Sequence, residues 1–166
     1  MNALAQTYRK ALHLLRRAEP LGPLAVRLCL GVLFAQSGWG KLHNLAGVTS
    51  FFESLGIPAP GLQAAFVGVV ELVGGGALVL GLATRLASLL LSGTMVVAIA
   101  TAQWKEFEGL AGFLTLAETV YLAGLVWLLV SGAGALALDA LIVRWSALRG
   151  PAGSEAPARA MAAKAQ

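Results

Sequence analysis

The stretch "LASLLLSGTMVVAIATAQW" occupies Leu86 to Trp104 and contains no charged residue. A helix needs roughly 20 mainly apolar residues to cross the hydrocarbon core of a bilayer, so this stretch is long enough to span a membrane. The whole sequence agrees, because 58% of its 166 residues are hydrophobic and only 12% are charged. A soluble domain has about 25% charged residues, and we therefore expect an integral membrane protein.

Three further apolar stretches of similar length lie on either side of this one. They run over about 24–42, 62–83 and 110–130. Together with 86–104 they predict an all-α protein, a transmembrane four-helix bundle that occupies 21–132. The link between the second and third spans is very short, so these two helices should be antiparallel neighbours.

The segments that flank and connect the spans differ from them in composition. Residues 1–20 place apolar side chains on one stripe among Arg and Lys, which predicts a cytoplasmic amphipathic helix on the membrane surface. A signal peptide is the competing interpretation, but Arg27 interrupts its would-be apolar core. Residues 43–60 predict a short interfacial helix, 133–149 predict a C-terminal interfacial segment, and 150–166 predict a disordered tail.

The distribution of Lys and Arg predicts the orientation of the spans. With the N-terminus inside, most of these residues lie in the cytoplasm: Arg9, Lys10, Arg16, Arg17, Arg85, Arg144, Arg149, Arg159 and Lys164. Only Lys41 and Lys105 then lie outside, while Arg27 is within a span. Basic residues concentrate on the cytoplasmic side of membrane proteins, so both termini should be cytoplasmic.

The composition also limits the possible partners and cofactors. The net charge is +4, and the basic residues stand beside apolar segments without stacking aromatics, which indicates membrane lipids as partners and not nucleic acid. Cys29 is the only cysteine, so an internal disulfide and a CxxC redox pair are excluded. His13 and His43 belong to no zinc or haem spacing motif, and no metal site is predicted.

Charged residues inside the spans are the first candidates for function. Glu71 is about midway along the second span, Arg27 is about a turn inside the first, and Glu118 is near the outer end of the fourth. An ionisable side chain at mid-bilayer costs roughly 2.5–3.5 kcal/mol on insertion scales. We therefore expect these side chains to face the bundle interior and to pair with one another.

Glycines share helix faces with these charges. They are Gly31 and Gly38 beside Arg27 and Lys41 on the first span, and Gly68 and Gly75 beside Glu71 on the second. Small residues let helices approach closely in membranes, so the first two spans should pack glycine against glycine. We expect Arg27 to reach Glu71, directly or through water, and Lys41 to pair with Glu118.

Such charges have more than one possible role. Buried ion pairs often fix the packing of helices without any chemistry. A lone carboxylate within the membrane can also be protonated and hydrogen-bonded. A polar cavity that binds a ligand or relays protons is the functional alternative, and the residues alone leave all three open.

The motifs taken together resemble the DoxX family of small bacterial and archaeal membrane proteins. The resemblance rests on "RLCLGVLFAQSGWGKL" at 27–42, "FFESLGIPAP" at 51–60, "VELVGGGALVLGLATRLA" at 70–87 and "SGAGALALDAL" at 131–141. These pieces occur in the family's order and spacing. Each is short and rich in glycine, so the specificity comes from their combination.

The resemblance implies a four-helix bundle in the inner (plasma) membrane. Some relatives are linked to quinone-coupled sulfur oxidation, and others to thiol or oxidative-stress systems with partner proteins. Carried over by matching position, the resemblance singles out Arg27, Lys41, Glu71 and Arg85. The sequence has no flavin, haem, iron–sulfur or dithiol motif, so a quinone or a partner subunit would have to hold the electrons in any redox reaction.

Three functional hypotheses follow. In the first, a membrane subunit supports an oxidoreductase through an internal polar site, where Glu71 exchanges protons and Arg27 binds an anionic oxygen. Lys41, Glu118 and Arg85 would then be ligand-binding residues, and a quinone is the candidate cofactor. The second is a non-catalytic scaffold for soluble redox proteins, and the third is a small transporter. A protein partner or a homo-oligomer is possible in each.

Overall fold

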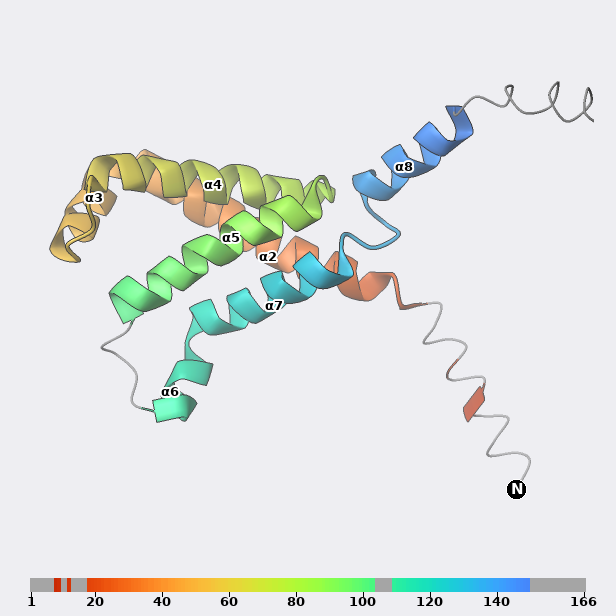
Figure 1. The fold of residues 1–166 in the computed structure, drawn as a ribbon, viewed down its shortest axis with the longest axis horizontal. Helices are drawn as coiled ribbons and strands as arrows, with labels where there is room; N and C mark the ends of the chain where they lie inside the picture. The colour runs from red at the N-terminus through yellow and green to blue at the C-terminus, as the bar shows by residue number, and fades with distance from the viewer. Residues whose placement is uncertain (1–7, 10–11, 13–17, 104–108, 150–166) are drawn as a thin grey trace, which may run out of the picture.

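The structure is a computed structural model, and it describes residues 8–9, 12, 18–103 and 109–149. Within these residues the chain forms helices and no strand, which confirms the all-α prediction. The helices are α2 (Leu21–His43), α3 (Leu45–Ser54), α4 (Pro60–Leu80), α5 (Thr84–Ala98), the π-helix η1 (Ile99–Gln103), α6 (Gly109–Thr115), α7 (Ala117–Ser131) and α8 (Leu138–Arg149) (Figure 1). The predicted helix at 1–20 and the predicted tail at 150–166 fall wholly or mostly outside the described residues.

Three of these helical segments are long and apolar enough to cross a membrane. They are α2, α4 and the continuous stretch Thr84–Gln103, which joins α5 to η1. The fourth apolar stretch forms two helices, α6 and α7, that pass the same test together and meet at an angle of 69°. Leu116 separates them in an extended backbone conformation, with φ −64° and ψ 134°. The chain is therefore a membrane protein with three unbroken candidate spans, and with four if α6 and α7 together form one bent span.

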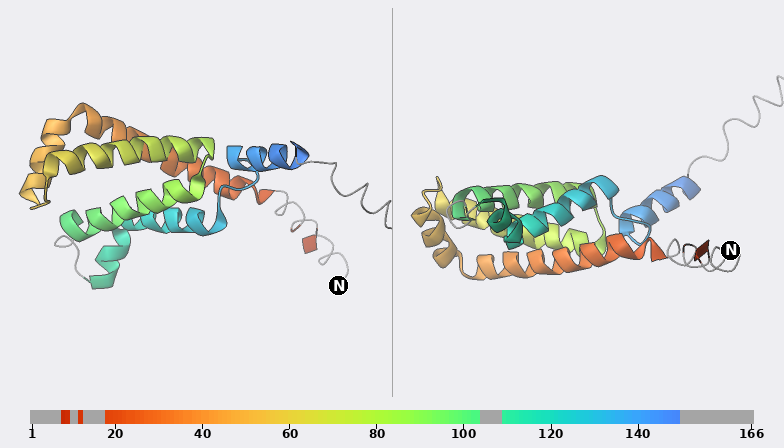
Figure 2. Two further views of the ribbon diagram at one scale, coloured as in Figure 1. Left: turned by 45° about the horizontal axis from the view of Figure 1, so that its top comes forward. Right: turned by 90° about the horizontal axis from the view of Figure 1, so that it is seen from below.

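The helices pack as two antiparallel pairs, α2 with α4 and α5 with α7 (Figure 2). Buried leucines from all four helices fill the space between the pairs, among them Leu30, Leu78, Leu91 and Leu125. The outer surfaces of the spans are covered with exposed apolar side chains, as a lipid-facing surface requires. Helix α3 lies across one end of the bundle, and α8 extends beyond the opposite end (Figures 1 and 2).

The contact between α2 and α4 confirms the predicted packing of glycine against glycine. A Cβ atom added to Gly38 would lie 2.6 Å from the carbonyl oxygen of Gly68, and one added to Gly31 would lie 2.8 Å from that of Gly75. The two backbones therefore touch, and no larger residue fits between them. Because Gly31 faces Gly75 and Gly38 faces Gly68, the two pairs fix which residues of α2 and α4 stand level with one another.

Candidate functional site

Glu71 is the buried carboxylate at the centre of the candidate site. It lies on α4, one turn from Gly68 and Gly75, and therefore on the helix face that meets α2. Only 2% of the residue is exposed. A carboxylate so deeply buried within a span needs a cationic or hydrogen-bonding partner.

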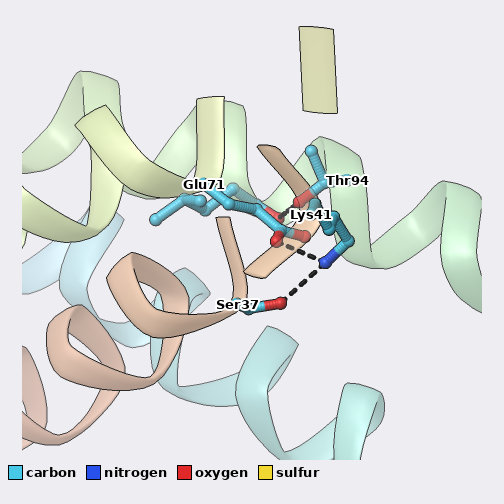
Figure 3. A network of polar contacts seen from close by, with 5 residues as sticks. Ser37, Lys41, Glu71 and Thr94 are labelled. Carbon is cyan, nitrogen blue, oxygen red and sulfur yellow. Dashed lines mark hydrogen bonds and ion pairs between the residues drawn. The ribbon is translucent and has the colours of Figure 1, made fainter. Parts of the chain in front are cut away.

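Lys41 on α2 provides that partner. Its Nζ lies 2.5 Å from Oε2 of Glu71 and also donates a hydrogen bond to Oγ of Ser37, at 2.6 Å. Figure 3 shows these three side chains as one connected group, with Thr94 of α5 beside them. The hydroxyl of Thr94 donates to the carbonyl of Leu91, one turn earlier. The site thus combines a charge pair with hydroxyl groups from two neighbouring helices.

The register of α2 and α4 explains this pairing. Side chains on a helix point back toward its N-terminus. Because α2 and α4 are antiparallel, the side chains of Lys41 and Glu71 point toward one another, at the level where Gly38 faces Gly68. The close approach of the two glycines therefore places the ammonium and carboxylate groups in contact.

The ion pair lines a cavity of about 850 Å³ that is bounded by α2, α3, α4, α5, η1 and α7. The walls are mainly apolar and include aromatic rings, namely Phe34, Phe51, Phe52, Phe66 and Tyr121. Polar side chains reach it at a few positions, namely Ser37, Lys41, Gln63, Glu71, Thr94, Thr101, Gln103 and Glu118. Mostly apolar walls with a few polar groups are typical of sites for small molecules.

Glu118 lies in this same cavity, but it does not pair with Lys41 as predicted. Its Oε1 accepts a hydrogen bond of 3.2 Å from Nε2 of Gln103. Glu118 stands in the first turn of α7, where the positive end of the helix dipole favours an acidic side chain. The predicted Lys41–Glu118 pair is wrong because Lys41 is committed to Glu71, on the helix that it directly contacts.

The predicted contact between Arg27 and Glu71 is also wrong. Arg27 is 1% exposed, and within the part of the chain that the structure describes its guanidinium group donates to backbone carbonyls alone: Nε to Leu78 at 3.0 Å, Nη1 to Ala133 at 2.5 Å and Nη2 to Leu136 at 3.3 Å. The last carbonyls of a helix have no partner within that helix and carry the negative end of its dipole. Arg27 therefore holds the end of α4 against the segment that follows α7.

Arg85 lies at the same end of the bundle as Arg27, away from the ion pair. Its Nη2 donates to the carbonyl of Val130 at 3.3 Å, and it lines a second cavity of about 790 Å³ together with Asp139. The carboxylate of Asp139 accepts hydrogen bonds from the backbone N–H groups of Ala83 and Thr84, at 2.8 and 3.2 Å. Asp139 thereby caps the start of α5.

The structure thus brings together three of the five predicted site residues, Lys41, Glu71 and Glu118, and separates Arg27 and Arg85 from them. Residues that were not predicted for the site, among them Ser37, Thr94, Gln103 and Tyr121, complete its polar lining. Ser37 could have been found because it stands one turn before Lys41 on the same helix face. The others are single polar residues within apolar spans.

Comparison with known protein families matches residues 22–104 to DoxX. The chain belongs to the DoxX family. The matched residues include Lys41, Glu71 and the glycines that pack α2 against α4, so the site described above lies mostly within the family's shared region.

Individual proteins from three bacteria are similar to the chain over most of its length. "Inner membrane protein YqjF" of Escherichia coli (strain K12) is 27% identical, over 77% of this chain and 97% of that protein. "Putative oxidoreductase CatD" of Bacillus subtilis (strain 168) is 32% identical, over 78% and 93%. "Uncharacterized membrane protein Rv3486" of Mycobacterium tuberculosis (strain ATCC 25618 / H37Rv) is 35% identical, over 76% and 85%. No solved structure matches the chain with statistical significance.

Proposed function

We propose that this DoxX protein is a membrane subunit that binds a quinone in the Lys41–Glu71 cavity and supports an oxidoreductase partner. The observation that carries the proposal is the ion pair itself, which lines an apolar cavity rich in aromatic side chains. The relative from Bacillus subtilis that is named as an oxidoreductase supports the general class of activity.

The side chains in the cavity fit a quinone. A quinone is a flat, lipophilic ring with carbonyl oxygens that accept hydrogen bonds, so it needs apolar walls and at least one donor. Phe34, Phe66 and Tyr121 offer aromatic faces for the ring, and Lys41 offers the donor. The volume of about 850 Å³ lies within the range of roughly 300–1,000 Å³ that ligand sites occupy.

The ion pair can position such a ligand and handle its protons. When bound, a quinone supplies a group that accepts two electrons and two protons. Lys41 has three N–H donors, of which Glu71 and Ser37 take two, so one remains for a ligand oxygen. The positive charge of Lys41 stabilises negative charge that develops on that oxygen, and the Glu71 carboxylate can accept and return a proton.

The roles of the two arginines change in this proposal. Arg27 uses its donors on backbone carbonyls, so Lys41 replaces it as the cation that faces the ligand. Arg85 lies in the other cavity and has no contact with the ion pair. Because the sequence carries no haem, flavin or dithiol motif, a protein partner would deliver the electrons.

We keep the predicted orientation as part of the proposal. With both termini in the cytoplasm, the Lys41–Glu71 cavity lies toward the outer face and the Arg27 and Arg85 end lies inside. Fusions of a reporter that is active on one side of the membrane, placed after Arg85 and after Ser54, would report this. The orientation is rejected if the fusion at Arg85 is found outside.

The proposed function can be tested by measuring the quinone that is bound to the purified protein. The full-length chain would be purified in mild detergent, extracted with organic solvent and analysed for quinones by mass spectrometry. We expect the wild type to carry about one quinone per chain, Lys41→Met to lose most of it, and Glu53→Gln to retain it. Glu53 is an exposed carboxylate on α3 that does not line the cavity, so Glu53→Gln shows the effect of neutralising a carboxylate elsewhere. It also serves as the control for Glu71→Gln, the variant used to test activity.

Activity supplies the second half of the test. Glu71→Gln keeps the shape of the side chain but removes its proton exchange, so we expect bound quinone to remain while quinone-dependent activity in membranes falls. If the wild type carries no quinone and Glu71→Gln cells retain full activity, the proposed function is wrong.

A further inference from the structure

Helices α4 and α5 separate from one another along their length, and part of the cavity lies between them. Near the turn that joins them they pack closely, because a Cβ atom added to Gly74 would lie 3.1 Å from Leu91. Farther along α5, nothing lies within 4 Å of a Cβ added to Gly93, which is exposed and lines the cavity. Figure 1 shows the two helices diverging from the turn. The space between them therefore widens toward the level of the ion pair.

On α4, the wall of the cavity continues onto the outer surface of the helix. Phe66 lines the cavity and is 57% exposed. Leu62, Val69 and Val73 share its helix face, and they are exposed without lining the cavity. Because α4 is apolar and long enough to span a membrane, these side chains belong to its lipid-facing surface. Phe66 thus stands where the cavity meets that surface.

On α5, the cavity has a matching edge. Leu89, Gly93 and Val97 line it and are exposed. Val96 lies on the same side of the helix as Leu89 and Gly93, and it is exposed but does not line the cavity. All four residues lie within the continuous apolar stretch Thr84–Gln103. The opening between α4 and α5 is therefore at membrane depth, where hydrocarbon chains surround the protein.

The wall between this opening and the ion pair is apolar. Val67 and Val70 of α4 and Leu90 of α5 line it. At its inner end stand the charged groups of Lys41 and Glu71 (Figure 3). One cavity thus joins a polar end inside the bundle to an apolar end at the lipid surface. A ligand that matches both ends has a polar ring and a long hydrocarbon chain.

We infer that the ligand of this cavity carries a long hydrocarbon chain, and that this chain passes Gly93 and leaves the bundle between α4 and α5. The ring lies at Lys41, and the chain extends along Val67 and Leu90 into the bilayer. Glycine at position 93 keeps the passage wide, because any larger side chain there would occupy the free space that now adjoins it. This inference rests on the proposed function and adds the class of quinone, one dissolved in the membrane by its chain.

The test compares two ligands with the same ring. Tetramethylbenzoquinone has no chain, and in trimethyldecylbenzoquinone a decyl group replaces one methyl group. Both rings are fully substituted, so neither offers a free ring position to the exposed thiol of Cys29. Wild-type protein in lipid nanodiscs would be titrated with each ligand, with empty nanodiscs subtracted and concentrations expressed per lipid. We expect similar affinities, because a chain gains little by moving from lipid to an apolar protein surface.

A variant at Gly93 locates the chain. Gly93→Leu should weaken binding of the decyl ligand about tenfold, because the added side chain occupies the path of the chain. It should leave binding of tetramethylbenzoquinone unchanged, which also shows that the variant folds with its ring site intact. Gly76→Leu is the matched control, since an added Cβ there also meets nothing within 4 Å and Gly76 does not line the cavity. If Gly93→Leu does not fold, Gly93→Val makes the same comparison with a smaller side chain.

The outcomes separate this inference from the proposed function. If Gly93→Leu binds both ligands as the wild type does, the chain does not pass Gly93, and the inference is wrong while the proposed function stands. An equal loss of both ligands also contradicts the inference, because position 93 would then serve the ring site or a contact with a second protein. If neither ligand binds saturably to the wild type, the proposed function falls and the inference falls with it.

Discussion

The ammonium group of Lys41 on α2 lies 2.5 Å from the carboxylate of Glu71 on α4, although 30 positions separate the two residues in the chain. The Glu71 side chain is 3% exposed and that of Lys41 is 25% exposed, so the carboxylate is the more deeply buried of the two charges that line the cavity. A pair arranged in this way compensates the buried charge and keeps an N–H donor available for a ligand.

Removing one partner of the Lys41–Glu71 pair should destabilise the protein more than removing both. Lys41→Met leaves Glu71 buried without its cation, and we expect a loss of about 3 kcal/mol, near the lower end for a buried pair because Lys41 is partly exposed. The double variant Lys41→Met/Glu71→Leu removes both charges and should recover most of that loss. Thermal unfolding in detergent, followed by fluorescence-detected size exclusion, measures both; a double variant no more stable than Lys41→Met would contradict the pairing.

The close contact of α2 and α4 gives a second prediction. Gly38→Ala places a methyl group against the backbone of Leu72 and the carbonyl of Gly68, so α2 must move away from α4, at a cost of about 1–3 kcal/mol. Because that movement also separates Lys41 from Glu71, quinone retention should fall with it. Gly40→Ala is the matched control on the same helix, since nothing lies within 4 Å of its added Cβ. Equal effects of the two substitutions would show that backbone contact is not what matters at Gly38.

The sequence was sufficient to predict three continuous apolar spans and the glycine contact, because both are properties of residue type and helical spacing; it did not predict that the fourth apolar stretch divides into two helices at Leu116. It was not sufficient for the pairing of charges, because that depends on how far one helix is displaced along another. The observed contacts supply this information. Gly31 faces Gly75, so Arg27, four residues before Gly31, stands opposite the end of α4 near Leu78 and well beyond Glu71.

The direction of the side chains adds the second part of the explanation. Arg27 points toward the N-terminus of α2 and thus away from Glu71, whereas Lys41 points toward it. The contribution of Gln103 could not be predicted, since it depends on the π-helical turn and on the break at Leu116 that together bring η1 close to the start of α7. Neither the π-helical turn nor the break at Leu116 contains a proline, so the sequence gives no signal for them.

Arg27 should behave as a structural residue. Arg27→Met leaves the carbonyls of Leu78, Ala133 and Leu136 without their donor, and we expect a loss of several kcal/mol, about 3 or more, because the donor is charged and buried. Arg27→Lys should recover little, since an ammonium group lacks the planar fork that reaches several carbonyls. The folded fraction of Arg27→Met should bind quinone with the affinity of the wild type. A loss of quinone affinity at unchanged stability would instead show that Arg27 takes part in ligand binding.

The turn between α4 and α5 gives the last prediction. Ala83 there adopts a left-handed conformation with φ 47°, which costs a residue other than glycine about 1 kcal/mol, and Asp139 holds the turn by accepting from its N–H and from that of Thr84. Asp139→Ala should therefore lower the free energy of unfolding by about 1–2 kcal/mol through loss of the cap. Ala83→Gly should raise the free energy of unfolding by up to about 1 kcal/mol by relieving the strain.

The two effects can be measured in the same thermal unfolding assay, with Gly76→Ala as a control at a position where an added Cβ meets nothing. If Asp139→Ala unfolds at the wild-type temperature, the Asp139 carboxylate does not stabilise the turn between α4 and α5.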